Sequence, residues 1–153
     1  REELNMLHDR MSIPIQGNDM NRTMNQWEIQ QLTKFNNISI GAHTKSHTKL
    51  SQLSVDSQKE EINESKEILE KISGQKIEIF SYPFGEDEDY TEQTVEILKT
   101  CGIKKAAVVK QGLYSKEYGE YRIPRNTVNG GTTVRQLKKI IEKSWFEYGE
   151  KAI

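Results

Sequence analysis

The sequence predicts an α/β fold in which parallel strands are surrounded by helices. Short apolar segments with strand-like alternation are separated by longer segments that have the periodicity of amphipathic helices. Alternation of strand and helix at these spacings is typical of βα units, which form parallel sheets. The length of 153 residues suits one domain, and no internal repeat divides it, so residues 1–153 are treated as a single domain.

The N-terminal part of the chain is expected to be helix, loop and helix. Residues 1–11 have the pattern of the end of a helix, and residues 12–24 have the composition of a loop. Asn25 and Glu28 have the spacing of a capping box, in which two side chains satisfy backbone N–H groups at the start of a helix. We therefore expect a second helix that runs to about Phe35.

A strand and a long helix come next. Residues 38–41 form a short alternating strand that ends at a glycine. After a polar stretch, Ser54 is a suitable N-cap, and Asp56 is well placed for the helix dipole. Gly74 fits the position just past the end of this helix. Apolar residues near a period of 3.6 define its buried face: Val55, Ile62, Leu69 and Ile72.

The remaining elements continue the alternation. Residues 77–82 read as a strand that ends at Pro83, because proline cannot donate a ladder hydrogen bond. A helix at 91–101 and a strand at 106–109 follow. The last helix is expected to start near residue 132 or 133, with one apolar stripe: Val134, Leu137, Ile141 and Trp145.

The composition excludes several classes of function. The chain has 22 Lys and Arg against 23 Asp and Glu, and a net charge of −1 provides no strong field for nucleic acid or an anionic membrane. No apolar run reaches the roughly 20 residues of a membrane span. A single cysteine, Cys101, excludes an internal disulfide framework and is expected to be a buried, inert thiol. Only 34% of residues are hydrophobic, which fits a domain without its most buried strands.

Two histidines lie at the functional end of the first βα unit. His43 and His47 follow the strand that ends at Gly41, and loops at the carboxyl ends of parallel strands are where sites are built. Two imidazoles four residues apart can face one metal ion if the segment turns once, and neutral imidazole suits Zn²⁺. The alternative is a pair of surface histidines in a polar loop.

A second candidate segment follows the next strand. Pro83 and Gly85 flank Phe84 and enforce a sharp turn just past the strand end. Such a turn can direct a backbone N–H at a developing oxyanion. Taken alone, the segment is equally an ordinary connection between a strand and a loop.

The two segments together resemble the polysaccharide deacetylase family, also called carbohydrate esterase family 4 or the NodB homology domain. Residues 40–50 resemble its second motif, a His, a Ser or Thr, two variable residues and a second His. Residues 80–85 resemble its third motif, a strand that ends in a Pro, aromatic, Gly turn. The helix between them and the segment at 121–125 also fit. The resemblance runs from about residue 4 to residue 145 and corresponds to the C-terminal two-thirds of the family domain.

The resemblance implies a partial or distorted (β/α) barrel that removes acetyl groups from polysaccharide, as an amide or ester hydrolase. It implies Zn²⁺ or another divalent transition metal with His43 and His47 as ligands, and a loop supported by the Thr44 hydroxyl. The backbone N–H of Phe84 would be the oxyanion donor. A sugar groove would be bordered by Tyr82, Pro83, Phe84, Gly85 and Tyr90.

Three departures from the family pattern bear on activity. The Asp-Asp motif that supplies the catalytic base and third ligand has no match and is expected upstream of residue 1. Ser81 stands where the third motif usually has Arg, and Arg125 could supply that charge from another loop. No His follows His47 to act as the late general acid. Exposed core edges would then favour homo-oligomers.

These departures leave two other hypotheses open. The chain could be a non-catalytic derivative that binds glycan or a partner with the same groove, or an unrelated α/β domain. The resemblance implies a place at the cell envelope or outside the cell, and the sequence itself fixes no location.

Overall fold

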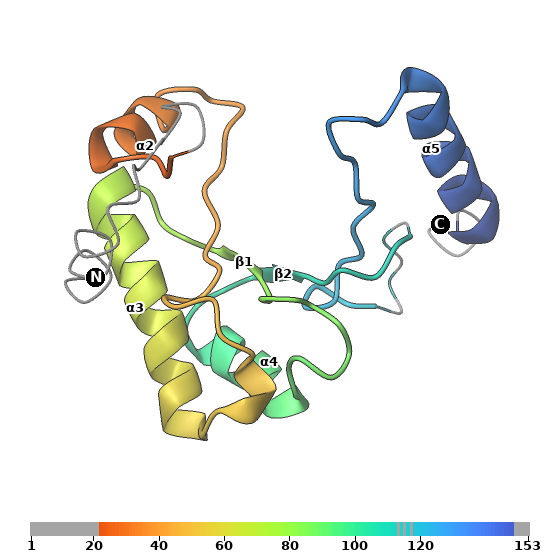
Figure 1. Cartoon of the computed structure of the whole chain (residues 1–153). Coiled ribbons are helices and arrows are strands. Elements are labelled where there is room, and N and C mark those ends of the chain that lie inside the picture. Colours follow the sequence, from red (N-terminus) through yellow and green to blue (C-terminus); the bar gives the residue numbers. More distant parts are fainter. Residues whose placement is uncertain (1–21, 113, 115, 117, 149–153) are drawn as a thin grey trace, which may run out of the picture.

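The computed structural model describes residues 22–112, 114, 116 and 118–148. The helix expected at 1–11 and most of the loop expected at 12–24 lie outside these residues. Two short parallel strands lie at the centre of the molecule (Figure 1), with the long helix α3 on one side and helix α4 below them. Helix α2 lies near one end of α3, and helix α5 lies apart on the opposite side of the strands.

The first described helix, α2 (Gln26–Leu32), begins as predicted. The Asn25 side chain accepts a hydrogen bond from the Glu28 N–H, and Glu28 Oε2 accepts one of 2.8 Å from the Asn25 N–H. The helix ends at Leu32, three residues before the predicted end at Phe35. A tight turn replaces the last helical turn, because the Phe35 N–H bonds to the Leu32 carbonyl at 3.1 Å.

The two central helices begin and end where local signals place them. Helix α3 (Val55–Ser73) is capped by the Ser54 hydroxyl and ends at Gly74, whose φ of 67° is left-handed as expected for a glycine stop. Helix α4 (Glu92–Thr100) has Thr91 as its N-cap in a reciprocal pair with Thr94. The two helices pack against each other.

The strands are parallel, which confirms the predicted class. Strand β1 (Ile79–Ser81) pairs with β2 (Lys105–Ala107), with Phe80 opposite Ala106. Isolated parallel bridges join Ala42 to Phe80 on one side and Ile123 to Ala107 on the other. Four chain segments thus lie side by side in one direction, and α/β packing with parallel strands is established.

The prediction of a strand at 38–41 is wrong, because these residues form no strand in the structure. Only Ala42 bridges to β1, through its N–H to the Ile79 carbonyl at 2.8 Å and its carbonyl to the Ser81 N–H at 2.9 Å. The two backbones come very close just before this bridge: a Cβ on Gly41 would lie 3.1 Å from the Ile79 oxygen. Glycine at position 41 therefore lets the segment that carries the histidines approach β1.

The core lies between α3, α4 and the strands, and Leu50, Ile62, Phe80 and Leu98 are among its fully buried side chains. Cys101 is half-buried against this core, and burial raises the pKa of its thiol, as expected for an inert cysteine. Among the described helices, none is long and apolar enough to cross a bilayer.

The last helix, α5 (Val134–Tyr148), forms where predicted, but three residues of its predicted apolar stripe do not join the core, and the fourth, Trp145, has a side chain outside the described part of the structure. Val134, Leu137 and Ile141 are exposed to solvent. Periodicity determines which residues share a face of a helix, whereas burial requires a neighbouring element. None of the other described elements covers this face.

Candidate metal centre

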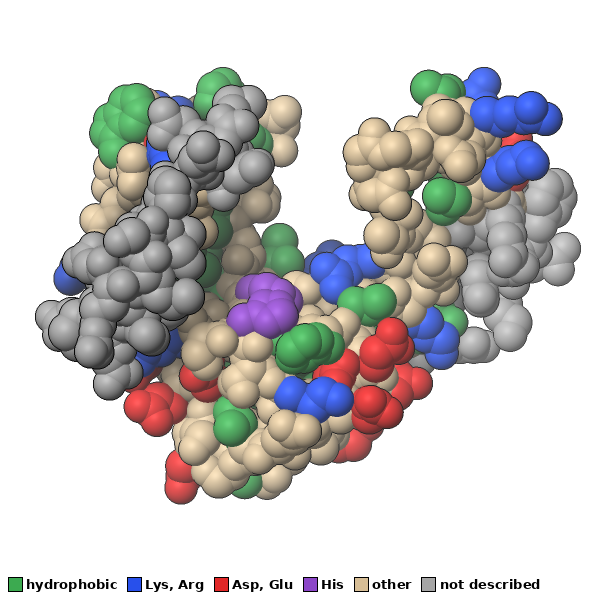
Figure 2. All heavy atoms as spheres, viewed as in Figure 1, with side chains coloured by type: hydrophobic (Ala, Val, Ile, Leu, Met, Phe, Trp, Pro, Cys, Tyr) green, Lys and Arg blue, Asp and Glu red, His purple; other side chains and the backbone are tan. Residues whose placement is uncertain are grey.

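The structure brings the two predicted histidines together. Both side chains lie at the floor of a hollow, with the part of the molecule that contains α2 on one side and the part that contains α5 on the other (Figure 2). The ring centroids of His43 and His47 are 4.8 Å apart and the rings meet edge to face at 76°. Both rings are exposed, so a ligand from solvent can reach them.

The orientation of the first histidine is fixed by the neighbouring strand. His43 Nδ1 lies 2.7 Å from the Ser81 carbonyl oxygen, which can only accept a hydrogen bond, so Nδ1 carries the proton. The lone pair of the neutral ring is then on Nε2. A second nitrogen held by a backbone carbonyl is the usual arrangement for a metal-binding histidine. Ser81 thus acts on His43 through its backbone carbonyl, so this contact does not depend on the Ser side chain that stands where the family motif usually has Arg.

Strained backbone is concentrated at this site. Thr44, His47 and Phe84 have φ angles of 61°, 56° and 62°, and they are the non-glycine residues with positive φ in the part of the chain that the structure describes. Such conformations cost about 1–3 kcal/mol each and persist where the surrounding structure enforces them. Strain of this kind clusters at ligand sites, which favours a functional role for both loops.

The second loop places an aromatic ring and a free donor beside the histidines. The Gly85 N–H bonds to the Pro83 carbonyl at 2.7 Å, which closes a tight turn around Phe84. The exposed Phe84 ring lies 5.1 Å from the His47 ring. No acceptor within the described residues lies against the Phe84 N–H. This N–H is therefore available to a ligand, and its role as an oxyanion donor stays a prediction.

Gly85 is expected to be the glycine of this site that least tolerates a side chain. Its φ is +80°, and a Cβ would lie 3.0 Å from both the Val109 N and Cγ2 atoms. We expect Gly85→Ala to lower the free energy of unfolding by about 2–3 kcal/mol, from backbone strain plus this collision. Gly74→Ala is the matched control, since Gly74 has a φ of +67° but nothing within 4 Å. It should lose only about 1 kcal/mol in urea denaturation, and equal losses would contradict the collision.

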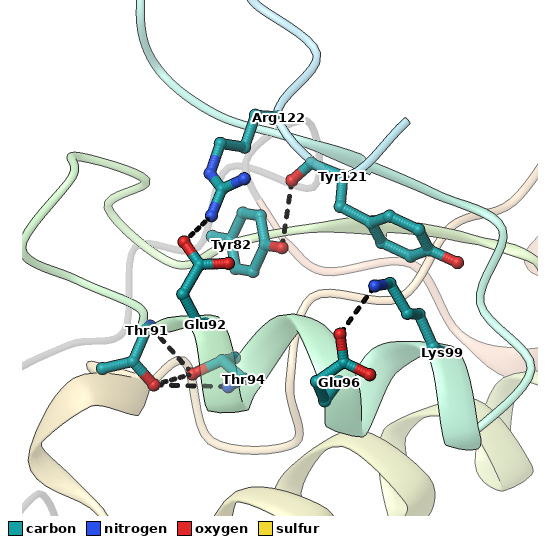
Figure 3. A network of polar contacts seen from close by, with 8 residues as sticks. All are labelled: Tyr82, Thr91, Glu92, Thr94, Glu96, Lys99, Tyr121 and Arg122. Carbon is teal, nitrogen blue, oxygen red and sulfur yellow. Dashed lines mark hydrogen bonds and ion pairs between the residues drawn. The ribbon is translucent and has the colours of Figure 1, made fainter. Parts of the chain in front are cut away.

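Most of the residues expected to border a sugar groove are buried. Tyr82 is only 1% exposed, its ring stacks on Tyr90 at 4.0 Å, and its hydroxyl donates to the Tyr121 carbonyl at 3.1 Å (Figure 3). Burial raises the pKa of Tyr82 far above its ordinary value. Tyr90, Pro83 and Gly85 are buried as well. Of the predicted groove residues, Phe84 alone presents its side chain at the surface.

Two supporting roles also differ from expectation. The Thr44 hydroxyl was expected to hold the loop, but it is buried without a hydrogen-bond partner among the residues that the structure describes. Arg125 Nε donates to the Val108 carbonyl at 2.9 Å, which ties the guanidinium to the end of the β2 segment. No described hydrogen bond or ring contact joins Arg125 to either histidine, so its assignment as a catalytic charge is unsupported by contacts.

Two groups at the site were missed by the sequence reasoning. Glu61 on α3 accepts three hydrogen bonds from the loop between the histidines. Asp89 lies buried beside the Phe84 loop and pairs with Lys49 at 2.6 Å. Neither has a local signal, because a carboxylate on a helix or in a loop normally faces solvent.

The residues present fit part of a metal site. Two neutral imidazoles are suitable ligands for Zn²⁺, and a structural or catalytic zinc takes three or four protein ligands. Among the described residues, no third His, Cys, Asp or Glu gathers with the pair. A cavity of about 250 Å³ adjoins His43 and has a largely apolar wall from α3, lined by Gly41, His43, Thr44, Lys45, Ser65, Ile68 and Leu69.

The histidine pair and the tight turn around Phe84 thus lie just beyond neighbouring segments of a parallel sheet, the edge at which α/β folds place ligand sites. The chain belongs to the polysaccharide deacetylase family, whose sequence profile matches residues 15–106. This membership confirms the resemblance drawn from the two motifs.

Several known proteins are similar to it. The chain is 30% identical over 105 residues to the putative polysaccharide deacetylase YxkH of Bacillus subtilis, a match that covers 69% of this chain and 37% of that protein. The deacetylase PplD of Streptococcus pyogenes has a TM-score of 0.70 at 22% identity, over 80% of this chain and 53% of that one. The putative polysaccharide deacetylase BA0330 of Bacillus anthracis has a TM-score of 0.69 at 26% identity, and the match covers 80% of this chain and 38% of that one. The chain thus spans little more than half, or less, of each relative.

Proposed function

We propose that this chain contributes the histidine part of a metal-dependent hydrolase that removes acetyl groups from polysaccharide. The observation that carries the proposal is the His43–His47 pair, 4.8 Å apart, with His43 oriented by the Ser81 carbonyl. Family membership and the putative deacetylase at 30% identity support the same activity. The parallel strands with flanking helices would be part of a (β/α) barrel, in keeping with the fold of PplD.

Each group at the site has a role in this proposal. His43, through the Nε2 atom that its bond to Ser81 leaves unprotonated, and His47 would hold Zn²⁺ or a similar divalent metal. The bound metal would polarise the acetyl carbonyl and lower the pKa of a water molecule. The Phe84 N–H would donate to the carbonyl oxygen as charge develops on it. The exposed Phe84 ring would border the sugar, since an aromatic face packs well on the apolar face of a pyranose.

The third ligand and the catalytic base would come from outside the described residues. Two imidazoles leave a tetrahedral metal incomplete, and a carboxylate is the usual partner for such a pair in hydrolytic sites. The proposal therefore concerns the histidine half of a site.

Calorimetric titration of Zn²⁺ into the chain tests the proposal. We expect the parent to bind one equivalent and the His43→Ala/His47→Ala variant to bind none. His8→Ala is the matched control, because it removes the third histidine of the chain and leaves the pair in place. Equal binding by the parent and the double variant would show that the pair is not a metal site. A parent that binds both Zn²⁺ and acetylated chitooligosaccharide without releasing acetate would indicate a non-catalytic glycan-binding derivative.

A further inference from the structure

We propose that Glu61 is a positioning residue for the histidine pair, and that it sets where His47 stands relative to His43. Glu61 lies on α3, well away from both histidines in sequence, and belongs to neither of the two motifs. The inference rests on the proposed metal site and adds the group that shapes it.

The contacts of Glu61 converge on the loop between the two histidines. Its Oε2 accepts hydrogen bonds from the Lys45 N–H at 3.0 Å and the Ser46 N–H at 2.9 Å. Its Oε1 accepts one from the Ser46 hydroxyl at 2.7 Å. Two consecutive amides directed at one anionic oxygen form a small anion-binding concavity, here filled by the carboxylate of the protein itself. Hydrogen bonds to a charged acceptor are stronger than those between neutral groups.

The loop needs such an anchor because its conformation is unfavourable by itself. Thr44 and His47 both have left-handed backbone, at φ 61° and 56°, on either side of Lys45 and Ser46. The amides of Lys45 and Ser46 donate to Glu61 rather than to a backbone carbonyl. Without the carboxylate, the strained residues could relax to right-handed or extended backbone.

The two histidines depend on this anchor to different extents. His43 is held directly by the Ser81 carbonyl on β1. His47 directly follows the anchored residues. Its ring contacts two other rings, those of His43 at 4.8 Å and Phe84 at 5.1 Å. A change at Glu61 should therefore move His47 while His43 stays in place, which would change the distance and angle between the two rings.

Helix α3 is a suitable support for this role. It has 19 residues and is capped at both ends, and Ile62, next to Glu61, is fully buried in the core. Partial burial of Glu61 would raise its pKa, but the bonds from Ser46 and Lys45 outweigh this effect and lower it. The carboxylate is thus ionised at neutral pH and acts only as an acceptor.

The neighbouring Glu64 provides a matched control. It lies three residues further along α3 and forms an ion pair with the Lys45 ammonium group, so it touches the same loop through an exposed side chain. Glu64→Gln removes a carboxylate of the same helix that also contacts Lys45. The hydrogen bonds from the Lys45 and Ser46 amides to Glu61 remain.

The test compares Glu61→Ala, Glu61→Gln and Glu64→Gln with the parent, after circular dichroism has shown that each is folded. We expect Zn²⁺ affinity, measured by calorimetry, to fall about 10–100-fold in Glu61→Ala, the usual effect of removing a group that orients metal ligands. Glu61→Gln, which keeps one acceptor oxygen, should lose less. Glu64→Gln should bind like the parent.

Two readouts without metal separate positioning from simple loss of stability. Hydrogen exchange at the Lys45 and Ser46 amides should be faster in Glu61→Ala than in the parent, with the amides of α3 unchanged. The ring proton signals of His47 in NMR spectra should shift more than those of His43, whose ring is held by the Ser81 carbonyl but lies 4.8 Å from the His47 ring.

Parental Zn²⁺ affinity in Glu61→Ala would overturn the inference, and so would parental amide exchange at Lys45 and Ser46. A parent that binds no Zn²⁺ would instead overturn the proposed function. In that case the amide exchange and the histidine signals would still decide whether Glu61 holds the loop, so the two failures are distinguishable.

Discussion

Replacing Tyr82 with alanine is expected to lower the free energy of unfolding by about 3–5 kcal/mol, the usual cost of removing a large aromatic ring from a core. The ring is 1% exposed and stacks on Tyr90, and its hydroxyl donates to the Tyr121 carbonyl. The loss would be comparable to the total stability of many domains of this size. Urea denaturation followed by circular dichroism measures it, and Tyr82→Phe should lose only the hydrogen bond, about 1 kcal/mol.

Phe84→Ala is the control for Tyr82→Ala. The two aromatic residues lie on either side of Pro83, but the Phe84 side chain is 54% exposed. Its loss should change the free energy of unfolding by only about 0.5 kcal/mol, as for other surface substitutions. If instead Tyr82→Ala unfolds like the parent, the ring is not part of the core and the sequence-based assignment to a sugar groove regains its force.

Replacing Asp89 with alanine is expected to cost about 3 kcal/mol, which is at the low end of the range for breaking a buried ion pair. The Asp89 side chain is 2% exposed, and its Oδ1 lies 2.6 Å from Lys49 Nζ. Its Oδ2 accepts a hydrogen bond of 2.7 Å from the Glu86 N–H, which would lose its partner. Lys49 remains 28% exposed and can be hydrated, so the cost stays below that of an isolated buried charge.

The same pair ties the two loops of the site together. Lys49 lies two residues after His47, and Asp89 lies in the loop that begins at Phe84. Glu88→Ala is the matched control, since Glu88 also approaches Lys49, at 3.4 Å, but its side chain is 81% exposed. A surface ion pair of this kind contributes about 0–1 kcal/mol. If both variants lose the same free energy in urea denaturation, burial of Asp89 is not what stabilises the contact.

The sequence by itself determined where α2 and α3 begin, where α3 ends, and the histidine pair. Asn25 with Glu28, Ser54 and Gly74 each act on backbone groups within a few residues, so their effect is written in local spacing. His43 and His47 lie four residues apart, and one turn of the chain is enough to bring their rings to 4.8 Å. The α/β class with parallel strands follows from the alternation of elements, which is also readable along the chain.

Only the tertiary structure decided which of these residues face solvent, which are buried and which are anchored. Tyr82 is buried because Tyr90 and the 121 segment cover it, and the stripe on α5 is exposed because none of the other described elements covers it. Glu61 reaches Ser46 across 15 residues, and Asp89 reaches Lys49 from the next βα unit. Such contacts depend on how helices and loops pack. Side-chain type and local periodicity do not predict this packing, because the partners are far apart in the sequence.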